Sequence, residues 1–445
     1  MKASPPPDLA EVVRETDKHV LMDGLGIVLD LEKSRGCRLV DAASGRKLLD
    51  CYGCFGSLPV GFNHRHFDLP EVRRELLLGA RSKVANSDVC SDLFGTFVHE
   101  FRRLAGLPPL ERYFFIEGGA LAVENALKAA MDWKVRKNLA AGRGERGTGI
   151  VHFEGAFHGR SGYTLSLTNT DPVKTAYFPK FAWPRLPAPV LDFSLPPDAR
   201  QEAAIASEAQ CEQMLRELFD KQSDELAAVI IEPIQGEGGD RHFRGEWLRT
   251  LRRLCDEHEL LLIFDEVQCG GGTTGRMWCC EHFGVTPDLL AFGKKAQACG
   301  VMAGPRLDEV PDNVFRLPGR INSTWGGNLV DMVRATHCLR IIDEDNLLEN
   351  ATRTGRRLLE SLAGLALRYP FVQAPRGRGL MIGFDLPTRE LRDRFHRGLF
   401  ELGLLALRGG ERTIRFRPAL DFPEDAVAEA AELLSRQCRR MNSST

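Results

Sequence analysis

The stretch "LLLIFDE" (residues 260–266) is a continuous apolar run that ends in two acids. A second run of the same kind, "LAAVIIEP" (226–233), comes before it, and the helical segment "GEWLRTLRRLCDEHE" (245–259) connects the two. Near-continuous apolar runs are typical of strands that are buried on both faces of a sheet. Strand, helix and strand in this order predict an α/β protein with a parallel sheet, whose ligands gather at the carboxyl ends of the strands.

The alternation of helical and strand-like segments continues on both sides of this unit. Residues 12–50 carry short alternating segments with turn signals between them, which predict a small antiparallel sheet. The proline-rich stretch 183–200 predicts a surface loop. The other elements that we expect are helices at 120–137, 328–344 and 424–441, and strands within 377–386 and 413–420.

The bulk composition restricts the class of protein. The chain has 445 residues, 43% hydrophobic and 27% charged, with a net charge of −2, which is ordinary for a soluble globular protein. The balanced charge argues against nucleic acid or an anionic membrane as the main partner, and no apolar run reaches the ~18 residues that a membrane span needs. The start, "MKASPPPDLAEVV" (1–13), has prolines where a signal peptide needs its apolar segment. We therefore expect a cytoplasmic protein.

The cysteines give no sign of a disulfide scaffold or a metal site. There are 12 of them, and several lie in apolar surroundings such as "MWCCEHFG" (277–284). Cys51 and Cys54 form a lone C-x-x-C pair, whereas a zinc site would need a second pair or two histidines at a matching spacing. We therefore expect no metal, and interpret the cysteines as buried thiols.

Two of the strand ends carry features that could bind a charged ligand. In "FFIEGGALAVENALKAA" (114–130), Gly118 and Gly119 stand between a strand and a helix, where free backbone N–H groups can hold an anion. Such a turn is also common without a ligand. Asp265 ends the strand at 260–266, where a carboxylate needs a cation or several donors. Taken alone, Asp265 is equally consistent with a capping or ion-paired acid.

A third strand end carries two adjacent lysines. Lys294 and Lys295 follow the apolar run in "DLLAFGKKAQACG" (288–300). Burial lowers the pKa of a lysine, and a neutral lysine amine can form a Schiff base with an aldehyde. An anion seat, an acid and a lysine at neighbouring strand ends are together the parts of a pyridoxal phosphate site. The position of the two lysines at a strand end does not decide between them.

Motifs along most of the chain resemble a known family. They are "EGGALAVENALKAA" (117–130), "GAFHGRSGYTLSLTNT" (155–170), "EPIQGEGGDRHF" (232–243), "FDEVQ" (264–268), "FGKKAQACGVMAG" (292–304), "NSTWGGN" (322–328) and "RGRGLM" (376–381). With them, residues 20–435 resemble a class III (omega) aminotransferase of fold type I. The resemblance implies a mainly parallel central sheet with helices on both faces, and a small α+β domain built from both termini. It places the small domain at 1–75 and 336–445, and the large cofactor-binding domain at 76–335.

The resemblance also implies the cofactor, pyridoxal 5'-phosphate, and the residues that hold it. In this family the lysine bonded to the cofactor follows the aspartate of a "PD" dipeptide by six residues, which from Asp288 selects Lys294. Asp265 would keep the pyridine nitrogen protonated. The other implied contacts are to the cofactor phosphate (Gly119, Ala120), to the two faces of the ring (Phe157, Val267) and to the ring hydroxyl (Gln268).

Substrate contacts follow from the same resemblance. Arg160 and Arg415 would bind substrate carboxylates, since an arginine grips a carboxylate with two hydrogen bonds. Glu237 would pair with Arg415 in one half of the reaction and release it in the other, and Asn322 would line the same pocket. Thr324 would reach the cofactor phosphate of a neighbouring subunit, which implies a homodimer with shared active sites.

Three points stay open in the sequence. Arg417 alternates with Arg415 on the strand "RFRP", so either could bind the carboxylate. His158 is equally consistent with a core histidine and with a cofactor contact. Cys269 and the segment 51–63 depart from the family pattern, which leaves the amino donor less certain than the cofactor.

The function implied is transfer of the terminal (epsilon) amine of L-lysine to 2-oxoglutarate, which gives 2-aminoadipate 6-semialdehyde and L-glutamate. Lys294 would act as general base and then as general acid. The alternatives are an aminotransferase for ornithine, 4-aminobutyrate or another terminal amine, a fold type I mutase or decarboxylase, and a non-catalytic relative that keeps only the fold. The pairing of Asp265 with a strand-end lysine argues against the non-catalytic relative.

Overall fold

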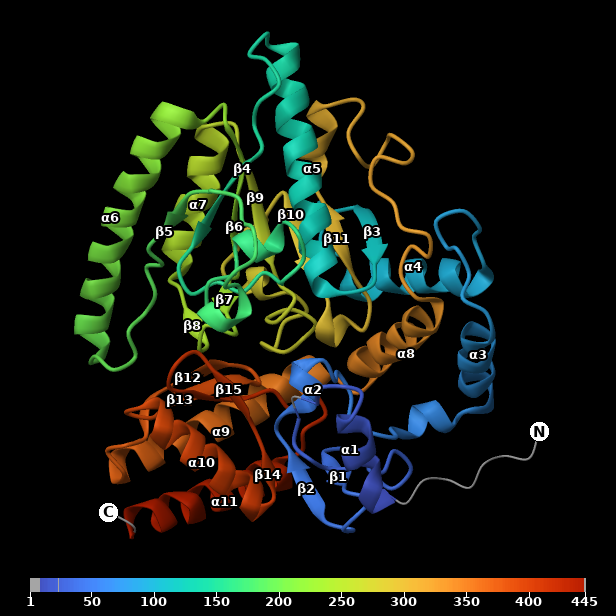
Figure 1. Ribbon diagram of the computed structural model, residues 1–445, viewed down its shortest axis with the longest axis vertical. Helices are drawn as coiled ribbons and strands as arrows, with labels where there is room; N and C mark the ends of the chain where they lie inside the picture. The colour runs from blue at the N-terminus through green and yellow to red at the C-terminus, as the bar shows by residue number, and fades with distance from the viewer. Residues whose placement is uncertain (1–8, 23, 444–445) are drawn as a thin grey trace.

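The computed structural model describes residues 9–22 and 24–443 (Figure 1). Most of the proline-rich start, residues 1–8, on which the expectation about a signal peptide rests, lies outside the described residues. Within the described part of the chain, no helix is long and apolar enough to cross a bilayer. The same residues contain no group of three or more His, Cys, Asp or Glu side chains that could hold a metal ion.

A seven-stranded sheet forms the centre of the molecule. Six of its strands run parallel and β11 alone runs antiparallel to its neighbours. The predicted unit of strand, helix and strand is present, because β6 and β9 pair in parallel with α7 (Gly245–Glu257) between them. The prediction of a mainly parallel sheet is confirmed. In spatial order the strands are β3 (Arg112–Ile116), β11 (Cys299–Ala303), β10 (Leu289–Phe292), β9 (Leu261–Asp265), β6 (Leu226–Ile231), β4 (Gly149–Phe153) and β5 (Arg185–Leu186).

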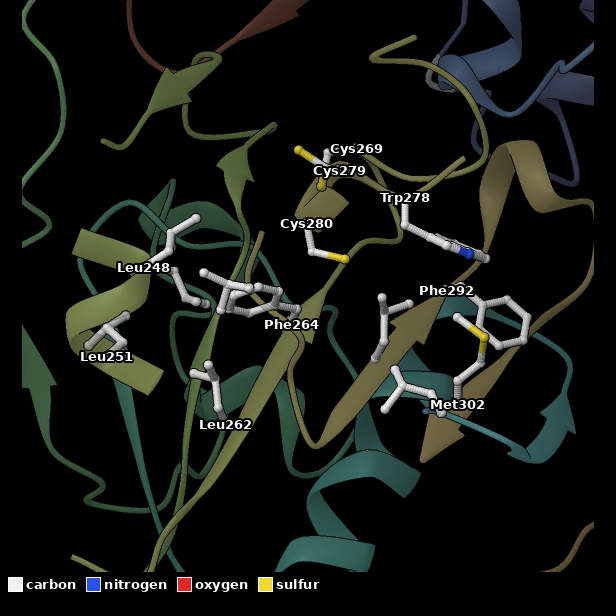
Figure 2. Packing of buried hydrophobic residues seen from close by; sticks show 14 of the residues in the cluster. Leu248, Leu251, Leu262, Phe264, Cys269, Trp278, Cys279, Cys280, Phe292 and Met302 are labelled. Atoms are coloured by element: carbon white, nitrogen blue, oxygen red, sulfur yellow. The ribbon is translucent and has the colours of Figure 1, made fainter. Parts of the chain in front are cut away.

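Helices cover both faces of this sheet. Successive residues of a strand point to opposite faces, so each central strand contributes apolar side chains to two cores. On β9, Ile263 packs in the core under α5 (Gly119–Ala140), whereas Leu262 and Phe264 pack in the core on the other face. Figure 2 shows the second core, with Phe264 beside Leu248 and Leu251 of α7. Each such buried side chain contributes ~1.5–3 kcal/mol relative to exposure. The other helices of that face are α4 (Asp92–Ala105), α6 (Pro197–Gln222) and α8 (Leu329–Glu344).

Segments from the two ends of the chain pack together beside the large sheet, at the bottom of Figure 1. A three-stranded sheet joins β1 (Arg38–Val40) and β2 (Lys47–Asp50) to β14 (Leu404–Leu405), with β14 parallel to β2. This confirms the expected small α+β unit from both termini. The remaining elements of this part are β12 (Gln373–Arg378), β13 (Met381–Asp385), β15 (Leu407–Gly409), β16 (Thr413–Phe416), α9 (Leu347–Arg368), α10 (Arg389–Leu402) and α11 (Glu424–Asn442).

Two local predictions were wrong in part. Within 12–50, β1 and β2 form an antiparallel pair, and isolated antiparallel bridges join Leu29 to Asp41 and Arg35 to Arg38. The third strand of the sheet comes from β14, and α1 (Leu9–Asp17) extends into this range as a helix. The stretch 183–200 contains the short strand β5 and the start of α6 at Pro197. Proline at the first helical position has no N–H to leave unpaired, so it starts a helix well.

The short elements connect these units. They are α2 (Gly53–Gly56), α3 (Pro70–Arg81), β7 (Ile234–Gln235), β8 (Arg241–His242), and the 3-10 turns η1 (Arg65–Asp68), η2 (Thr164–Ser166), η3 (Pro172–Lys174), η4 (Cys279–His282), η5 (Lys294–Ala296) and η6 (Pro305–Glu309).

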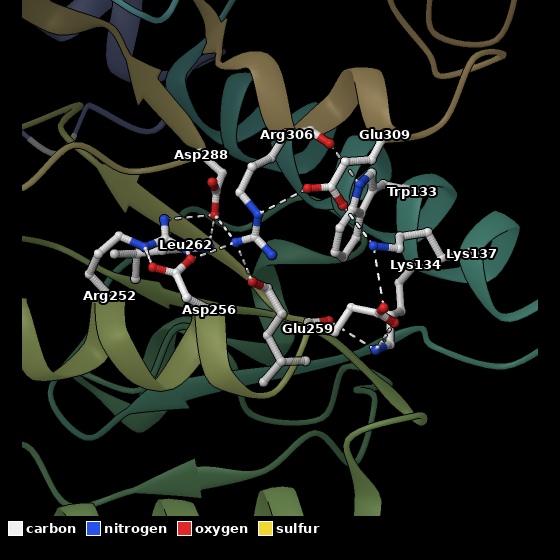
Figure 3. Close-up of polar contacts among 11 residues, drawn as sticks. Trp133, Lys134, Lys137, Arg252, Asp256, Glu259, Leu262, Asp288, Arg306 and Glu309 are labelled. Atoms are coloured by element: carbon white, nitrogen blue, oxygen red, sulfur yellow. Dashed lines mark hydrogen bonds and ion pairs between the residues drawn. The ribbon is translucent and has the colours of Figure 1, made fainter. Parts of the chain in front are cut away.

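Polar contacts fix the register of β10 at its amino end. The buried carboxylate of Asp288 accepts from the backbone N–H of Leu262 at 2.7 Å and from Arg252 and Arg306 at 2.8 and 3.2 Å (Figure 3). The four residues of β10 and Gly293 then separate Asp288 from Lys294. The six-residue spacing therefore corresponds to the strand β10, which Asp288 holds at its amino end, and the turn that follows the strand.

Candidate active site

The parallel strands bring several sequence-predicted residues to one edge of the sheet. β9 ends at Asp265, and β10 ends one residue before the Gly293–Lys294 turn. β6 ends before Glu232, and β3 leads into Gly118 and the start of α5. Because β3, β6, β9 and β10 run in the same direction, these four ends meet at the carboxyl edge of the sheet.

Lys294 lies at this edge in a left-handed backbone conformation, with φ of 48°. That conformation is uncommon for a residue with a side chain and stores local strain. The amine Nζ donates to the carbonyl oxygen of Phe55 at 3.0 Å. Burial, followed by the nearby charge of Arg415, lowers the pKa of Lys294 to about 8. The neutral form of this amine is therefore easier to reach near neutral pH than that of an ordinary lysine, as a nucleophile requires.

Lys295 has a different environment although it is the next residue. It is 3% exposed, and its Nζ donates to the carbonyl oxygens of Leu58 at 2.7 Å and Pro418 at 2.8 Å. Burial, followed by the charge of Arg417, lowers its pKa to about 7. Its amine therefore joins the N-terminal and C-terminal segments, whereas Lys294 remains partly exposed. The geometry favours Lys294 for chemistry and Lys295 for structure.

Asp265 is buried and paired with a histidine. Its Oδ2 lies 2.8 Å from Nδ1 of His158, and its Oδ1 accepts from the backbone N–H of Val267 at 3.0 Å. The His158 ring is fully buried, and its Nε2 has no partner among the described residues. The ring therefore donates from Nδ1 to the carboxylate. The contact gives His158 a role in holding Asp265, which is neither of the two interpretations that the sequence left open.

Glu232 belongs to the site although sequence reasoning did not select it. Its buried carboxylate accepts from the backbone N–H of Phe157 at 3.0 Å and of Gly236 at 2.9 Å. It thereby joins the Phe157 loop to the loop that carries Glu237. Burial raises the pKa of Glu232 to about 7. The available signal was an acid directly after the apolar run "LAAVII", the same signal that selected Asp265.

The start of α5 has no side-chain cap, so its backbone N–H groups can receive an anion. Gly118 has φ of 99°, which favours glycine, and Gly119 begins the helix. A Cβ on Gly119 would come within 2.7 Å of the Val267 side chain, so only glycine fits there. Ala120 follows, packed against Gly159 of the Phe157 loop. The structure thus brings Gly119, Ala120 and Val267 together, with free N–H groups at the helix start.

The two candidate arginines have different partners. Arg415 is 2% exposed, and its Nη2 donates to Glu237 Oε2 at 2.7 Å, while its Nη1 lies 3.4 Å from Gln268 Oε1. Arg417 is equally buried, and its Nη1 donates to Asp240 Oδ2 at 2.9 Å. Since Asp240 is completely buried, removing Arg417 from it would leave a bare buried charge. The structure favours Arg415 as the arginine that is free to exchange partners.

Three predicted residues do not join this cluster within the described chain. Arg160, Asn322 and Thr324 are exposed, and no hydrogen bond or ion pair connects them to Lys294 or Asp265 among the residues described. Asn322 Oδ1 accepts from the backbone N–H of the following serine at 2.7 Å. Their assignment to substrate and cofactor stays a prediction.

The site combines an acid and a lysine at neighbouring strand ends with a helix that begins at a glycine. Together these features indicate a pyridoxal phosphate-dependent transferase. The chain belongs to the class III aminotransferases: the family model "Aminotransferase class-III" matches residues 23–437. It is 51% identical over 406 residues to the L-lysine-epsilon aminotransferase of Mycobacterium tuberculosis H37Rv, covering 91% of this chain and 90% of that protein. The L-lysine-epsilon aminotransferase of Streptomyces clavuligerus is 45% identical over 428 residues, covering 96% and 93%. The solved structure of lysine aminotransferase from M. tuberculosis in the internal aldimine form superposes with a TM-score of 0.93 at 49% identity, covering 96% and 98%.

The cofactor is pyridoxal phosphate, and the residues present fit it. Gly119 and Ala120 begin α5 without a side-chain cap, so their backbone N–H groups are available to a phosphate. Asp265, held by His158, is a suitable partner for a protonated pyridine nitrogen. Lys294 supplies a partly exposed amine at the carboxyl end of β10.

Proposed function

We propose that this protein transfers the ε-amine of L-lysine to 2-oxoglutarate, which gives 2-aminoadipate 6-semialdehyde and L-glutamate. The observation that carries the proposal is the ion pair between Glu237 and Arg415, at 2.7 Å. Release of this pair would give the site a second state, in which Arg415 is open to the carboxylate of a ligand. The lysine-specific names of the relatives, at 45–51% identity over more than nine-tenths of the chain, support the choice of amino donor.

The roles of the chain's own residues follow from their positions. Bound pyridoxal phosphate supplies an electron sink, which its protonated pyridine nitrogen strengthens. Asp265 would hold the proton on that nitrogen, and His158 would orient the Asp265 carboxylate. The Lys294 amine, with its lowered pKa, would take a proton from the substrate carbon that carries the reacting amine and deliver it to the cofactor carbon on the other side of that nitrogen. Phe157 and Val267 would enclose the ring and exclude water.

Glu237 and Arg415 would let one pocket accept two substrates. L-Lysine presents a single carboxylate, and 2-oxoglutarate presents one at each end. While lysine reacts, Glu237 would cover Arg415, so no bare guanidinium faces the aliphatic chain. When 2-oxoglutarate binds, its distal carboxylate would replace Glu237 on Arg415 with two charge-assisted hydrogen bonds.

An amino-donor panel tests the proposal. With 2-oxoglutarate as acceptor, L-lysine is expected to give a kcat/KM at least about tenfold above ornithine and 4-aminobutyrate, because one or two methylene groups in a fitted pocket change specificity by about 10–200-fold. The product is measured by trapping the cyclised semialdehyde. A higher kcat/KM with ornithine or 4-aminobutyrate would mean that this amine, and not lysine, is the preferred donor. If no amine were transferred, the aminotransferase function would be refuted.

We also propose a homodimer in which Thr324 contacts the cofactor phosphate of the partner subunit. Thr324 is exposed, and the adjacent Trp325 is an apolar ring that is 42% exposed, as expected of a surface that another subunit covers. Light scattering is expected to give about twice the 49.6 kDa of one chain. Mixed dimers of Lys294→Ala and Thr324→Ala chains should then regain one intact site. A monomeric active enzyme, or no recovery in the mixed dimer, would contradict this arrangement.

A further inference from the structure

The carboxylate of Glu237 lies between two cations, of which sequence reasoning selected only one. Its Oε2 accepts from Arg415 Nη2 at 2.7 Å, and its Oε1 accepts from Lys174 Nζ at 2.6 Å. The Lys174 side chain is 23% exposed and the Arg415 side chain 2% exposed, so Lys174 is the cation on the solvent side. Burial raises the pKa of Glu237, but the two cations together hold that pKa below its ordinary value.

The backbone holds Lys174 in this position. It is the last residue of η3, whose N-cap Asp171 accepts from the N–H of Val173 at 3.0 Å, and the N–H of Lys174 donates to Asp171 O at 3.1 Å. The Lys174 Nζ lies 5.1 Å from the centroid of the Phe157 ring. Lys174 is therefore fixed at the edge of the site, next to the ring proposed to cover the cofactor.

We propose that Lys174 keeps Glu237 paired when Arg415 turns to a dicarboxylate, and that it thereby sets how readily the site exchanges its two kinds of substrate. This inference rests on the proposed function, in which Arg415 alternates between Glu237 and a substrate. Lys174 acts as a positioning residue: it binds Glu237 through Oε1, the oxygen that Arg415 does not use, and does not need to touch the substrate.

The charges around Glu237 explain why Lys174 would affect the binding of a dicarboxylate. If Glu237 left Arg415 without another partner, a half-buried carboxylate would lose its counter-ion, which is costly. Lys174 removes that cost, because one of the two ion pairs survives the exchange. Without Lys174, the distal carboxylate of a dicarboxylate would also compete with Glu237 for the single remaining cation. Both effects weaken dicarboxylate binding and leave a monocarboxylate, which does not displace Glu237, almost unaffected.

The test is binding of unreactive ligands to the holoenzyme, measured by titration calorimetry. Lys174→Met is expected to raise the Kd of glutarate by about tenfold and to change the Kd of butyrate by less than about twofold. Lys174→Arg keeps the charge and should restore most of the glutarate affinity. Lys180→Met is the control, since Lys180 belongs to the same segment but donates only to the carbonyl oxygens of Thr175 and Phe178.

A double-mutant cycle with Glu237→Ala shows whether Lys174 acts through Glu237. In the Glu237→Ala background, Lys174→Met should change the glutarate Kd by less than about twofold. A persisting tenfold loss would mean that Lys174 binds the ligand directly, and equal losses for glutarate and butyrate would mean a general charge effect; either overturns the inference. An unchanged glutarate Kd in the single variant would overturn it too. If the double-mutant cycle gave the expected result but the enzyme did not transfer the amine of L-lysine, only the proposed amino donor would be refuted.

Discussion

Lys294→Ala is expected to lower the rate of transamination by about 10³-fold or more, because it would remove both the amine that we propose binds the cofactor and the group that we propose moves the proton. The variant should still fold, since the Lys294 side chain is partly exposed and its one hydrogen bond goes to the Phe55 carbonyl. Single-turnover absorbance changes with L-lysine and with L-glutamate, measured separately, give the loss in each half-reaction. Both halves should fall together.

Lys295→Met is the matched control at the adjacent position. Lys295 donates to two carbonyl oxygens in the interior, and methionine would leave both without a donor. The expected cost is ~1–3 kcal/mol of folding stability for each unpaired group, with the reaction itself largely kept. Borohydride reduction of the wild-type protein, followed by peptide mapping, should place the cofactor on Lys294. A label on Lys295, or near wild-type turnover of Lys294→Ala, would reverse these assignments.

The fold could be predicted because its determinants are local in sequence. The runs at 226–233 and 260–266, with one helix between them, already require a parallel pair, and the acids and lysines that follow the strands then lie at one edge. The prediction of a sheet within residues 12–50 missed its third strand, β14, because a pairing between Leu49 and Leu404 leaves no local pattern. The helix α6 was missed at its start because prolines were interpreted only as loop residues.

The candidate site could be predicted only in part, because many of its contacts join residues that are far apart in the sequence. Asp265 and the adjacent pair Lys294 and Lys295 could be selected because charged residues follow an apolar run there, and the family spacing then chose Lys294. The residues that contact the site from distant parts of the chain could not be predicted in this way. His158 is 107 residues from Asp265, Glu232 is 75 residues from Phe157 and Lys174 is 63 residues from Glu237. The choice between Arg415 and Arg417 likewise depended on the buried Asp240, whose position no strand pattern reveals.

The environment of Asp265 explains why it can act on a bound ring rather than cap the chain. Its two oxygens accept from His158 Nδ1 at 2.8 Å and from the N–H of Val267 at 3.0 Å. Neither donor belongs to a lysine or an arginine, so no lysine or arginine pairs with this carboxylate among the described residues. A protonated pyridine nitrogen is the cation that we propose it receives.

Asp265→Asn should therefore retain the cofactor more loosely and lower kcat by on the order of 10²–10³. A close opposite charge shifts a pKa by ~1–3 units, and each unit is tenfold, so an amide would let the ring nitrogen lose its proton and weaken the electron sink. The pH titration of cofactor absorbance should move in parallel with the loss of turnover. Glu266→Gln is the control, because the Glu266 carboxylate, one residue on, accepts from the backbone N–H groups of Cys279 and Cys280 instead; it should change stability and leave kcat near the wild-type value. If Asp265→Asn kept near wild-type turnover, or if Glu266→Gln lost as much, Asp265 would be a structural acid, and the pairing of Asp265 with the ring nitrogen would have to be abandoned.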